Sequence, residues 1–363
     1  MREFARKIDQ IRALAARHDL DAILLQRASS FAWMTCGASA YVNIASSDSV
    51  ASLLITTDKL FLISDNIEAP RLEKEEQLAD QGWEFCTEPW YQAASTPPEI
   101  TRGLRIGTDK YYPDALDLTD EIAHLRAYLG PEEGQRFRSL GQLCAQAIES
   151  AARAVRPAQS EYEIAALLDA EAQRRGVQAV VNLIASDERI FQFRHPLPTH
   201  KKLERYAMLI LCGRQSGLVC SVTRLVHFGP LPGEIRRKAE AVARLDAALI
   251  AATRPGRTLG EVFRQGAEMY ASLGYPDEWR LHHQGGPSGY EPREYLARPD
   301  SREQIALGQA YAWNPSIRGA KSEDTILIGE SGNEILTRSP GWPVVPIEVD
   351  GIVIERPAIL EIV

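Results

Sequence analysis

The sequence predicts an α+β protein with two domains. Short apolar runs typical of strands alternate with longer segments whose apolar residues recur at a helical spacing. The chain has 363 residues, which is more than one hydrophobic core usually serves. A cluster of turn-forming residues at 129–134, Leu-Gly-Pro-Glu-Glu-Gly, separates two stretches of different composition. We therefore expect a first domain over residues 1–131 and a second over residues 132–363.

The first domain is expected to mix helices and strands. Residues 3–18 place Phe4, Ile8, Ile11 and Leu14 on one helical face, and a helix rich in charged residues follows at about 69–80. Strands are expected at the short apolar runs 22–25, 51–55, 60–63 and 105–108. The polar segment 56–59 between two of these runs is turn-like.

The second domain is expected to contain two similar halves. An amphipathic helix at 137–155 ends at Arg156-Pro157, and Ser160 offers a cap for a second helix that runs to Gly176. A similar phrase at 254–261 precedes another helix that ends at Leu273-Gly274. Two helix–proline–helix units, each followed by strands, indicate a duplicated α+β half.

Composition excludes several classes of protein. The chain is 45% hydrophobic and 25% charged, with a net charge of -8, and no basic stripe of the kind that binds nucleic acid is present. Its amino terminus is charged throughout and lacks the apolar core of a signal peptide. No run approaches the roughly 18 apolar residues of a membrane span. We expect a cytoplasmic protein without nucleic-acid or membrane partners.

The cysteines predict neither disulfides nor structural zinc. There are five, an odd number without a Cys-x-x-Cys pair, at positions 36, 86, 144, 212 and 220. Free cysteine is among the most buried residue types. We therefore expect buried thiols.

Several segments carry a family resemblance across nearly the whole chain. They are residues 20–25, 31–37, 207–213, 217–224, 281–294, 313–315 and 322–328. Together they resemble the creatinase/aminopeptidase P/prolidase family, also called peptidase M24. The resemblance implies a small α/β creatinase-like amino-terminal domain followed by a pita-bread domain like that of creatinase and methionine aminopeptidase. It also implies a homodimer in which one amino-terminal domain closes the pocket of the partner.

The resemblance places the five family metal-ligand positions at Cys212, Ser221, Gly286, Asn314 and Glu323. Only Glu323 keeps a carboxylate, whereas a dinuclear site needs several anionic or imidazole ligands. We therefore expect no catalytic metal and no other cofactor.

Substitute zinc ligands are an alternative, with Cys212, Cys220, His282 and His283 as the candidates. Strand alternation need not point the two thiols the same way, and adjacent histidines do not readily bind one ion together.

His195 is the strongest catalytic candidate. It lies in Arg-His-Pro-Leu-Pro-Thr at 194–199, which is similar to a phrase of creatinase, a member that hydrolyses a C–N bond without metal and uses this histidine as general acid/base. Imidazole titrates near neutrality and can move a proton in either direction. The alternatives are a structural histidine and a substrate-binding histidine, as in metal-using relatives.

Glu323 is the second catalytic candidate. A buried carboxylate without a cation must be protonated or paired, and Arg224, Arg293 or a cationic substrate are the expected partners. Arg293 occupies the place of a second family histidine and can grip a carboxylate with two donors. An internal ion pair between Arg293 and Glu294 is the alternative.

The remaining candidates are expected to bind substrate. Gly286 is expected to leave room where a ligand and its metal would have stood, and Tyr290 to supply a phenol donor. The full set of substrate-binding candidates is His282, His283, Gly286, Tyr290, Arg293, Glu294, Arg224, Cys212, Ser221 and Asn314.

Three functions are consistent with these residues. The favoured one is a metal-independent hydrolase of a C–N bond in an amidine, amide or amino-acid derivative. Creatine itself is not expected, because Thr223 replaces a catalytic-domain glutamate of creatinase and the Phe-Gly-Arg that grips its substrate is missing. The second is a non-catalytic pseudopeptidase that binds a peptide or small molecule, and the third is a conventional Xaa-Pro aminopeptidase or dipeptidase.

Overall fold

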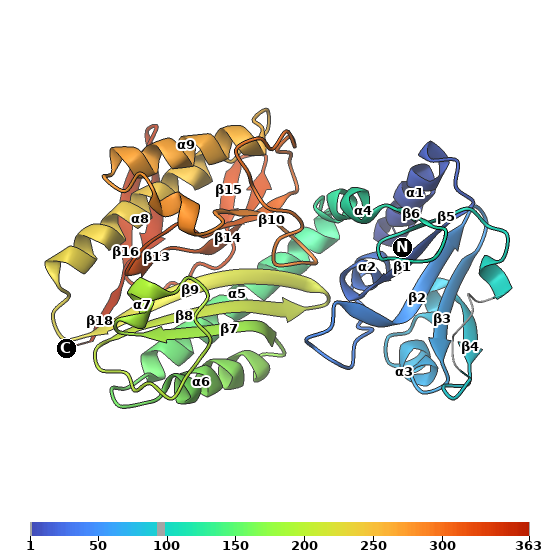
Figure 1. Cartoon of the computed structure of the whole chain (residues 1–363), viewed down its shortest axis with the longest axis horizontal. Helices are drawn as coiled ribbons and strands as arrows, with labels where there is room; N and C mark the ends of the chain where they lie inside the picture. The colour runs from blue at the N-terminus through green and yellow to red at the C-terminus, as the bar shows by residue number, and fades with distance from the viewer. Residues whose placement is uncertain (1, 93–98, 363) are drawn as a thin grey trace. The chain divides into compact units, whose positions relative to one another are not determined.

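The computed structural model describes residues 2–92 and 99–362. The chain forms two compact units, of which the first ends at Arg126 and the second begins at Ala127 (Figure 1). The boundary expected after residue 131 falls at the start of a long helix of the second unit.

The first unit is built on a six-stranded sheet in the order β4-β3-β2-β1-β5-β6. Its strands are β1 (Ala22–Arg27), β2 (Asp48–Thr56), β3 (Leu60–Asp65), β4 (Glu84–Glu88), β5 (Ile106–Thr108) and β6 (Leu116–Asp117). β2 runs antiparallel to both β1 and β3, and the other neighbours are parallel. The four strands expected from apolar runs are confirmed.

The helices of the first unit flank this sheet (Figure 1). They are α1 (Arg2–Arg17), α2 (Ala28–Met34), α3 (Ala69–Lys74) and α4 (Thr119–Arg126), with short 3-10 turns η1 (Ala79–Gln81) and η2 (Glu99–Thr101). α1 buries Ile8, Ile11 and Leu14 as its period predicted. The helix expected at 69–80 ends early, because Gln77 adopts a left-handed φ of 56° that no α-helix accepts.

The second unit repeats one arrangement, two helices and a four-stranded sheet. Its first half holds α5 (Pro131–Ala154), α6 (Glu161–Gln173), β7 (Gln178–Ser186), α7 (Arg189–Gln192), β8 (Tyr206–Gln215) and β9 (Leu218–Phe228). The second half holds α8 (Gly233–Ala252), α9 (Leu259–Ser272), η3 (Glu278–Leu281), β10 (Gly285–Ser288), β11 (Ala310–Trp313), β14 (Asp324–Gly329) and β15 (Gly332–Ile335). This is the duplication that the repeated helix–proline–helix phrase predicted.

Two small hairpins and a last strand complete the second unit. They are β12 (Ser316–Ile317) with β13 (Ala320–Lys321), β16 (Val344–Val349) with β17 (Ile352–Pro357), and β18 (Leu360–Ile362). The sheets are ordered β18-β9-β8-β7 and β10-β11-β14-β15.

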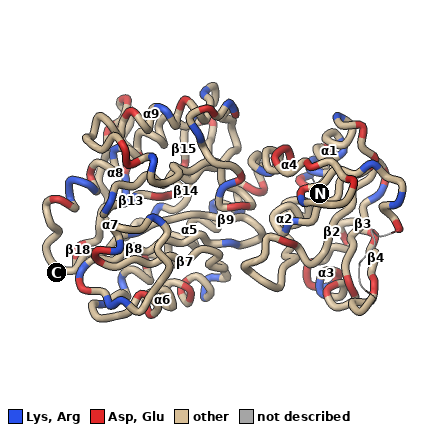
Figure 2. The backbone as a smooth tube through the Cα atoms, viewed as in Figure 1, with Lys and Arg blue, Asp and Glu red and all other residues tan. Residues whose placement is uncertain are grey.

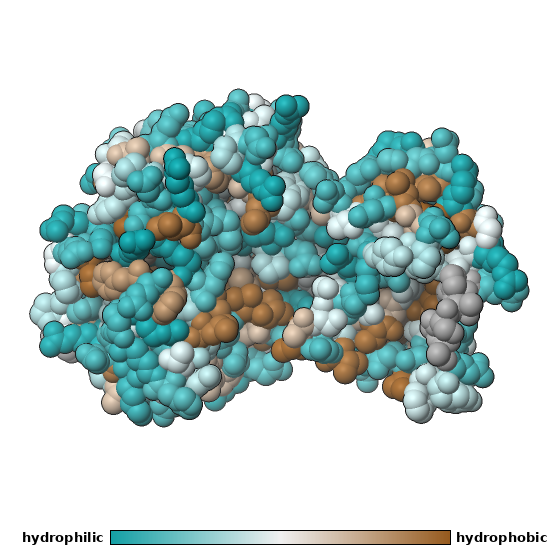
Figure 3. All heavy atoms as spheres, viewed as in Figure 1, coloured by the Kyte–Doolittle hydropathy of each residue, from teal (hydrophilic) through white to brown (hydrophobic). Residues whose placement is uncertain are grey.

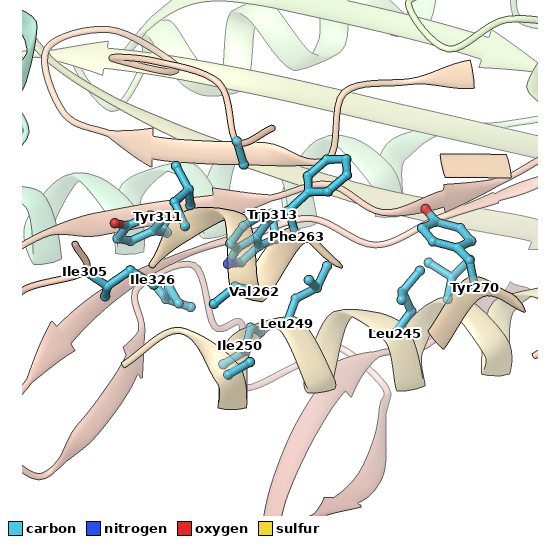
Figure 4. Packing of buried hydrophobic residues seen from close by; sticks show 14 of the residues in the cluster. Leu245, Leu249, Ile250, Val262, Phe263, Tyr270, Ile305, Tyr311, Trp313 and Ile326 are labelled. Carbon is cyan, nitrogen blue, oxygen red and sulfur yellow. The ribbon is translucent and has the colours of Figure 1, made fainter. Parts of the chain in front are cut away.

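The hydrophobic core of the second half packs against strands β11 and β14, which lie next to Asn314 and Glu323 in the chain. Leu249 of α8 and Phe263 of α9 pack with Trp313 of β11 and Ile326 of β14 (Figure 4). The Trp313 indole nitrogen donates a hydrogen bond of 2.8 Å to the Thr253 hydroxyl, so this ring is oriented as well as buried. β11 and β14 are thereby held rigidly as antiparallel neighbours.

Reciprocal caps begin the second helix of each half. Ser160 Oγ accepts the backbone N–H of Glu163, whose carboxylate accepts the N–H of Ser160. Thr258 and Glu261 form the same capping box at α9. The Ser160 cap predicted from the sequence is confirmed.

The Thr258 cap allows a test of local stability. We expect Thr258→Ala to lower the free energy of unfolding by about 1 kcal/mol, because it leaves a first-turn N–H of α9 without its acceptor. Urea denaturation followed by circular dichroism measures this change. Thr258→Ser keeps the hydroxyl and should stay near the parent stability; equal losses in both variants would contradict the capping argument.

The surface is mixed in character. Basic and acidic residues are interspersed along both units (Figure 2), and hydrophilic residues cover most of the face drawn in Figure 3, with apolar residues in separate patches. Within residues 2–92 and 99–362, no helix is long and apolar enough to cross a membrane.

Candidate active site

Glu323 is the centre of a buried ionic cluster and directly precedes β14. Its Oε1 accepts from Arg293 Nη2 at 2.9 Å, and its Oε2 lies 2.8 Å from Lys321 Nζ and accepts from the Thr223 hydroxyl at 2.6 Å. The Arg293, Lys321 and Glu323 side chains are 9%, 5% and 3% exposed. We call these four residues the Glu323 cluster.

The cluster holds Glu323 ionised. Burial alone would raise the pKa of this carboxyl, but Lys321 and Arg293, helped by hydrogen bonds from Lys321 and Thr223, lower it to about 2. The expectation that Glu323 would be paired, with Arg293 as a partner, is confirmed.

Arg224, the other expected partner of Glu323, is not one. Its Nη2 lies 3.0 Å from Asp324 Oδ1 and donates to the Thr337 carbonyl at 2.8 Å. The reason is strand alternation: successive side chains point to opposite faces, so Thr223 and Arg224 diverge on β9 as Glu323 and Asp324 do on β14. Arg224 therefore belongs to the opposite face of the sheet and does not bind substrate beside Glu323.

Lys321 was missed from the sequence. A signal was present, because residues two apart in an extended chain share a face, and Lys321 precedes Glu323 by two positions. Nothing local, however, indicated that this short connection from β13 to β14 is extended.

A second set of buried charges lies on the other face and holds the same segment. Arg356 Nη2 lies 2.5 Å from Asp246 Oδ2 and 2.6 Å from Asp324 Oδ2, and the Ser322 hydroxyl donates to Asp246 Oδ2 at 2.5 Å. Arg224, Asp246, Asp324 and Arg356 are called the buried charge network. It anchors residues 322 and 324, and so fixes the intervening Glu323.

Three histidines from two segments meet beside the Glu323 cluster. His195 follows α7, and His282 and His283 follow η3; the Nε2 atoms of His195 and His282 lie 3.1 Å apart. Ring centroids are 4.9 Å apart for His195 and His282, and 4.5 Å for His282 and His283. His282 and His283 therefore lie next to the catalytic candidate His195.

This histidine group is uncharged at neutral pH. Burial, assisted by Lys321, lowers the pKa of His195 below its ordinary value and that of His282 to about 2. Burial and the Arg293 guanidinium lower the pKa of His283 to about 4. His195 is exposed to solvent whereas His282 is only 9% exposed, so His195 is the member that a substrate can reach.

Cys212 and Ser221 line the same face. They are cross-strand partners in β8 and β9, with Sγ and Oγ 3.3 Å apart, and Arg293 Nη1 donates to Ser221 Oγ at 3.1 Å. Burial raises the pKa of the Cys212 thiol to about 11, so it is protonated. Arg293 thus links Ser221 to Glu323.

Cys220 points the other way, toward Cys144 of α5, and its thiol together with burial raises the pKa of Cys144. Strand alternation therefore separates the two thiols of the alternative zinc set. All five cysteines are free, but Cys36 and Cys86 are only partly buried. The expectation of buried thiols is wrong for these two, because Cys36 lies in a turn with φ 63° and Cys86 lies on the edge strand β4.

Gly286 does not leave room for a ligand. A Cβ built at this residue would lie 2.2 Å from the Tyr295 carbonyl oxygen and 3.3 Å from Ala297 N. The chain's own backbone therefore occupies the space that the sequence assigned to substrate. Glycine is required here by close backbone packing.

Tyr290 and Glu294 shape the loop after β10. The Tyr290 hydroxyl donates to Glu133 Oε1 of α5 at 2.8 Å, and its side chain is 2% exposed, so it does not offer the expected donor to substrate. Glu294 Oε1 accepts the N–H groups of Tyr290 and Glu291 at 2.8 and 3.2 Å. The alternative ion pair between Arg293 and Glu294 is wrong, because the Arg293 guanidinium is turned to Glu323.

Asn314 follows β11 directly, next to Trp313, which pairs with Asp324 of β14. It is 3% exposed, and its Oδ1 is buried with no hydrogen-bond partner in the part of the chain that is described. Its backbone N–H donates to the Gln284 carbonyl at 3.1 Å.

The five family ligand positions do not fit a pair of metal ions. Glu323 is already bound to two cations, the Cys212 thiol is protonated, and backbone fills the space at Gly286. The nitrogens of the histidine group lie within 4.8 Å of one another and have the chemistry of metal ligands. Lys321 and Arg293, which lower the pKa values of these histidines, equally repel a divalent cation.

A hollow of about 380 Å³ adjoins the histidine group and is lined by His282 and His283. Phe263 and Trp279 form part of its wall, and Arg280 and Arg298 also line it. The site therefore combines neutral imidazoles, a paired carboxylate and nearby cations. This arrangement can transfer protons and hold a polar ligand.

Solved structures similar to this chain include an Xaa-Pro dipeptidase and a prolidase. The chain superimposes on an Xaa-Pro dipeptidase from Bacillus anthracis with a TM-score of 0.77 and 18% identity, covering 99% of this chain and 100% of that one. A prolidase from Pyrococcus furiosus gives a TM-score of 0.75 and 18% identity, covering 90% and 99%. These likenesses confirm the pita-bread fold.

Sequence relatives of the chain carry different names. An Xaa-Pro dipeptidase of Pyrococcus furiosus is 25% identical over 61% of this chain and 66% of that protein. An agropine synthesis cyclase of Rhizobium rhizogenes is 29% identical over 36% of this chain, and the match spans only 35% of that relative's length.

The family itself follows from the second unit. Residues 135–330, which contain three strands of each sheet and every member of the Glu323 cluster and the histidine group, match the metallopeptidase family M24. The creatinase/aminopeptidase P/prolidase resemblance is thereby confirmed, and this chain, with its M24 peptidase-like hydrolase fold, belongs to the metallopeptidase family M24.

Proposed function

We propose that this protein hydrolyses a C–N bond in a small amide, amidine or amino-acid derivative without the metal pair of its family, and that His195 is the general acid/base. The observation that carries the proposal is the contact between His195 and His282. Two uncharged imidazoles lie with Nε2 atoms 3.1 Å apart, at a site where Glu323, the one carboxylate left at the family ligand positions, is already paired with Arg293 and Lys321.

The contact provides one proton and one lone pair. A neutral imidazole has one N–H and one acceptor nitrogen, so one of the two Nε2 atoms donates to the other. His282 is nearly buried and has a lower pKa than His195, so the proton that is gained during reaction resides on His195. His282 then acts by orienting the His195 ring.

Hydrolysis by this pair balances with water alone. Water attacks the carbon of the C–N bond while His195 takes one of its protons. The C–N bond then breaks as His195 returns that proton to the leaving nitrogen. Glu323 stays ionised throughout and holds Arg293 and Lys321 beside the reacting group.

Removal of metal tests this proposal. We expect a panel of amides, amidines, N-acyl amino acids and Xaa-Pro dipeptides, followed by mass spectrometry, to contain a compound whose turnover survives dialysis against a chelator. Added Mn²⁺ or Zn²⁺ should not raise that turnover. Elemental analysis of the same sample provides the control for residual metal.

Two outcomes would replace the proposal. Cleavage of Xaa-Pro dipeptides only after Mn²⁺ or Zn²⁺ is added would indicate a conventional peptidase, the activity named for several relatives. Binding of panel members without any chemical change would indicate a pseudopeptidase.

A further inference from the structure

We propose that the substrate carries a carboxylate and that Lys321 and Arg293 bind it; the proposal deepens the proposed function, since it concerns the same site. The observation behind it is the unequal charge of the Glu323 cluster. Two cations face one carboxylate there, and the adjoining histidines are uncharged.

Buried charge of this kind favours an added anion. Lys321 and Arg293 are 5% and 9% exposed, so water screens their charges weakly. Burying Lys321 and Arg293 costs free energy because both ions lose water. Glu323 offsets only part of this cost, and a second carboxylate would offset more of it. Since the excess is a single positive charge, a monoanionic group fits better than a dianionic phosphate.

Both cations have donors to spare. An ammonium has three N–H groups, and Glu323 is the ionic partner of Lys321 within the described chain. Arg293 Nη1 and Nη2 are used by Ser221, Pro292 and Glu323, whereas its Nε is buried without a partner among the described residues. An incoming carboxylate can accept from Lys321 and Arg293 without displacing Glu323.

The replaced metal-ligand positions explain why the site prefers an anion to a cation. Relatives that bind metal need several carboxylates at these positions to attract cations. Here neutral side chains or glycine stand at Cys212, Ser221, Gly286 and Asn314, and Lys321 and Arg293 surround the remaining carboxylate. The electrostatic preference of the site is therefore reversed from cations to anions.

The hollow beside the histidine group offers space for the rest of such a molecule. It is lined by His282 and His283, and the aromatic rings of Phe263 and Trp279 offer apolar walls. Arg280 and Arg298 line it as well, and no acidic side chain is among its described lining residues. These two guanidinium groups raise the local concentration of anions at the hollow.

Acid and amide pairs test the charge requirement. The probes are N-acetylglycine, benzoate and propionate, each compared with its neutral amide, and the readout is the ring NMR signals of His195, His282 and His283 in histidine-labelled full-length protein. We expect saturable shifts with at least one acid and at least tenfold weaker binding of its amide. Equal binding of acids and amides, or no shift with any acid, would overturn the proposal.

Variants locate the anion. Lys321→Met should weaken acid binding at least tenfold, Lys321→Arg should retain it, and the exposed Lys59→Met in the first unit should have no effect. If Lys321→Met does not fold, the comparison of acids with amides on the parent protein and Lys321→Arg still decides. Unchanged acid binding in a folded Lys321→Met variant would refute the role of Lys321.

The measurement separates this inference from the proposed function. Acid binding in His195→Ala protein, where catalysis should be lost, is expected to persist. Saturable acid binding without turnover of any compound would leave the carboxylate site standing and remove the hydrolase. Turnover of neutral amides without acid binding would support the hydrolase and refute the carboxylate site.

Discussion

Replacing His195 by alanine is expected to lower kcat for C–N hydrolysis by about 10²–10⁴-fold, the usual contribution of a positioned general acid/base. KM should change little, because the cations that are proposed to bind substrate are untouched. Added imidazole should restore part of the rate by entering the space left by the ring. Steady-state kinetics on a compound found with the panel measures all three effects.

A histidine five residues away provides the matched control. His200 is exposed and packs edge-on against Tyr162, with ring centroids 4.9 Å apart, so His200→Ala should retain the parent rate. The pH profile adds a second check. Because the pKa of His195 is lowered, the neutral base persists below the ordinary histidine pKa, and the acid limb of the profile should lie below about pH 6.5. Full turnover by His195→Ala would disprove the assigned role.

How far the sequence predicts the site depends on the range of each interaction. The carboxylate of Glu323 needed a cation, and Arg293 was correctly named, because a buried charge must be paired whatever the fold. Arg224 was wrongly named for the same role. Deciding between the two arginines requires the face of β9 on which each side chain lies, and strand register sets that face.

At both Gly286 and Lys321, the prediction from sequence failed because it depended on packing in three dimensions. The sequence showed that Gly286 lacks a side chain but not that the Tyr295 carbonyl would fill the space. Lys321 lies in a two-residue strand whose pairing with β12 is visible only in three dimensions. The position of a residue within a family motif therefore predicts that it lies at the site. The space left for a ligand depends on backbone packing, which the motif does not predict.

The fold was more accessible than the site. Strands β1, β2, β3 and β5 and the caps of α6 and α9 depend on neighbouring residues, and these local patterns are present in the sequence. The parallel pairing of β18 with β9 joins residues more than a hundred positions apart. No local pattern predicts such a contact.

Replacing Arg356 by methionine should produce the largest loss of stability, about 3–5 kcal/mol in the free energy of unfolding. Arg356 is 0% exposed and pairs with Asp246 and Asp324. Without the guanidinium, the Asp246 and Asp324 carboxylates remain buried on one side of the segment that carries Glu323, and Arg224 stays paired with Asp324. Urea denaturation at pH 7, fitted to a two-state transition, measures the loss.

The pH dependence of this loss distinguishes uncompensated charge from lost packing. Burial already raises the pKa of Asp246 in the parent protein, and loss of Arg356 removes the main opposing influence. A carboxyl whose folded pKa exceeds its unfolded pKa destabilises the fold increasingly as the pH rises, so Arg356→Met should lose more stability at pH 8 than at pH 5. The exposed Arg338→Met, which breaks a surface pair with Glu355, should cost at most about 1 kcal/mol at both values. A loss for Arg356→Met that is equally large at both pH values would mean that packing of the arginine stem, and not the charge on Asp246 and Asp324, holds the Glu323 segment in place.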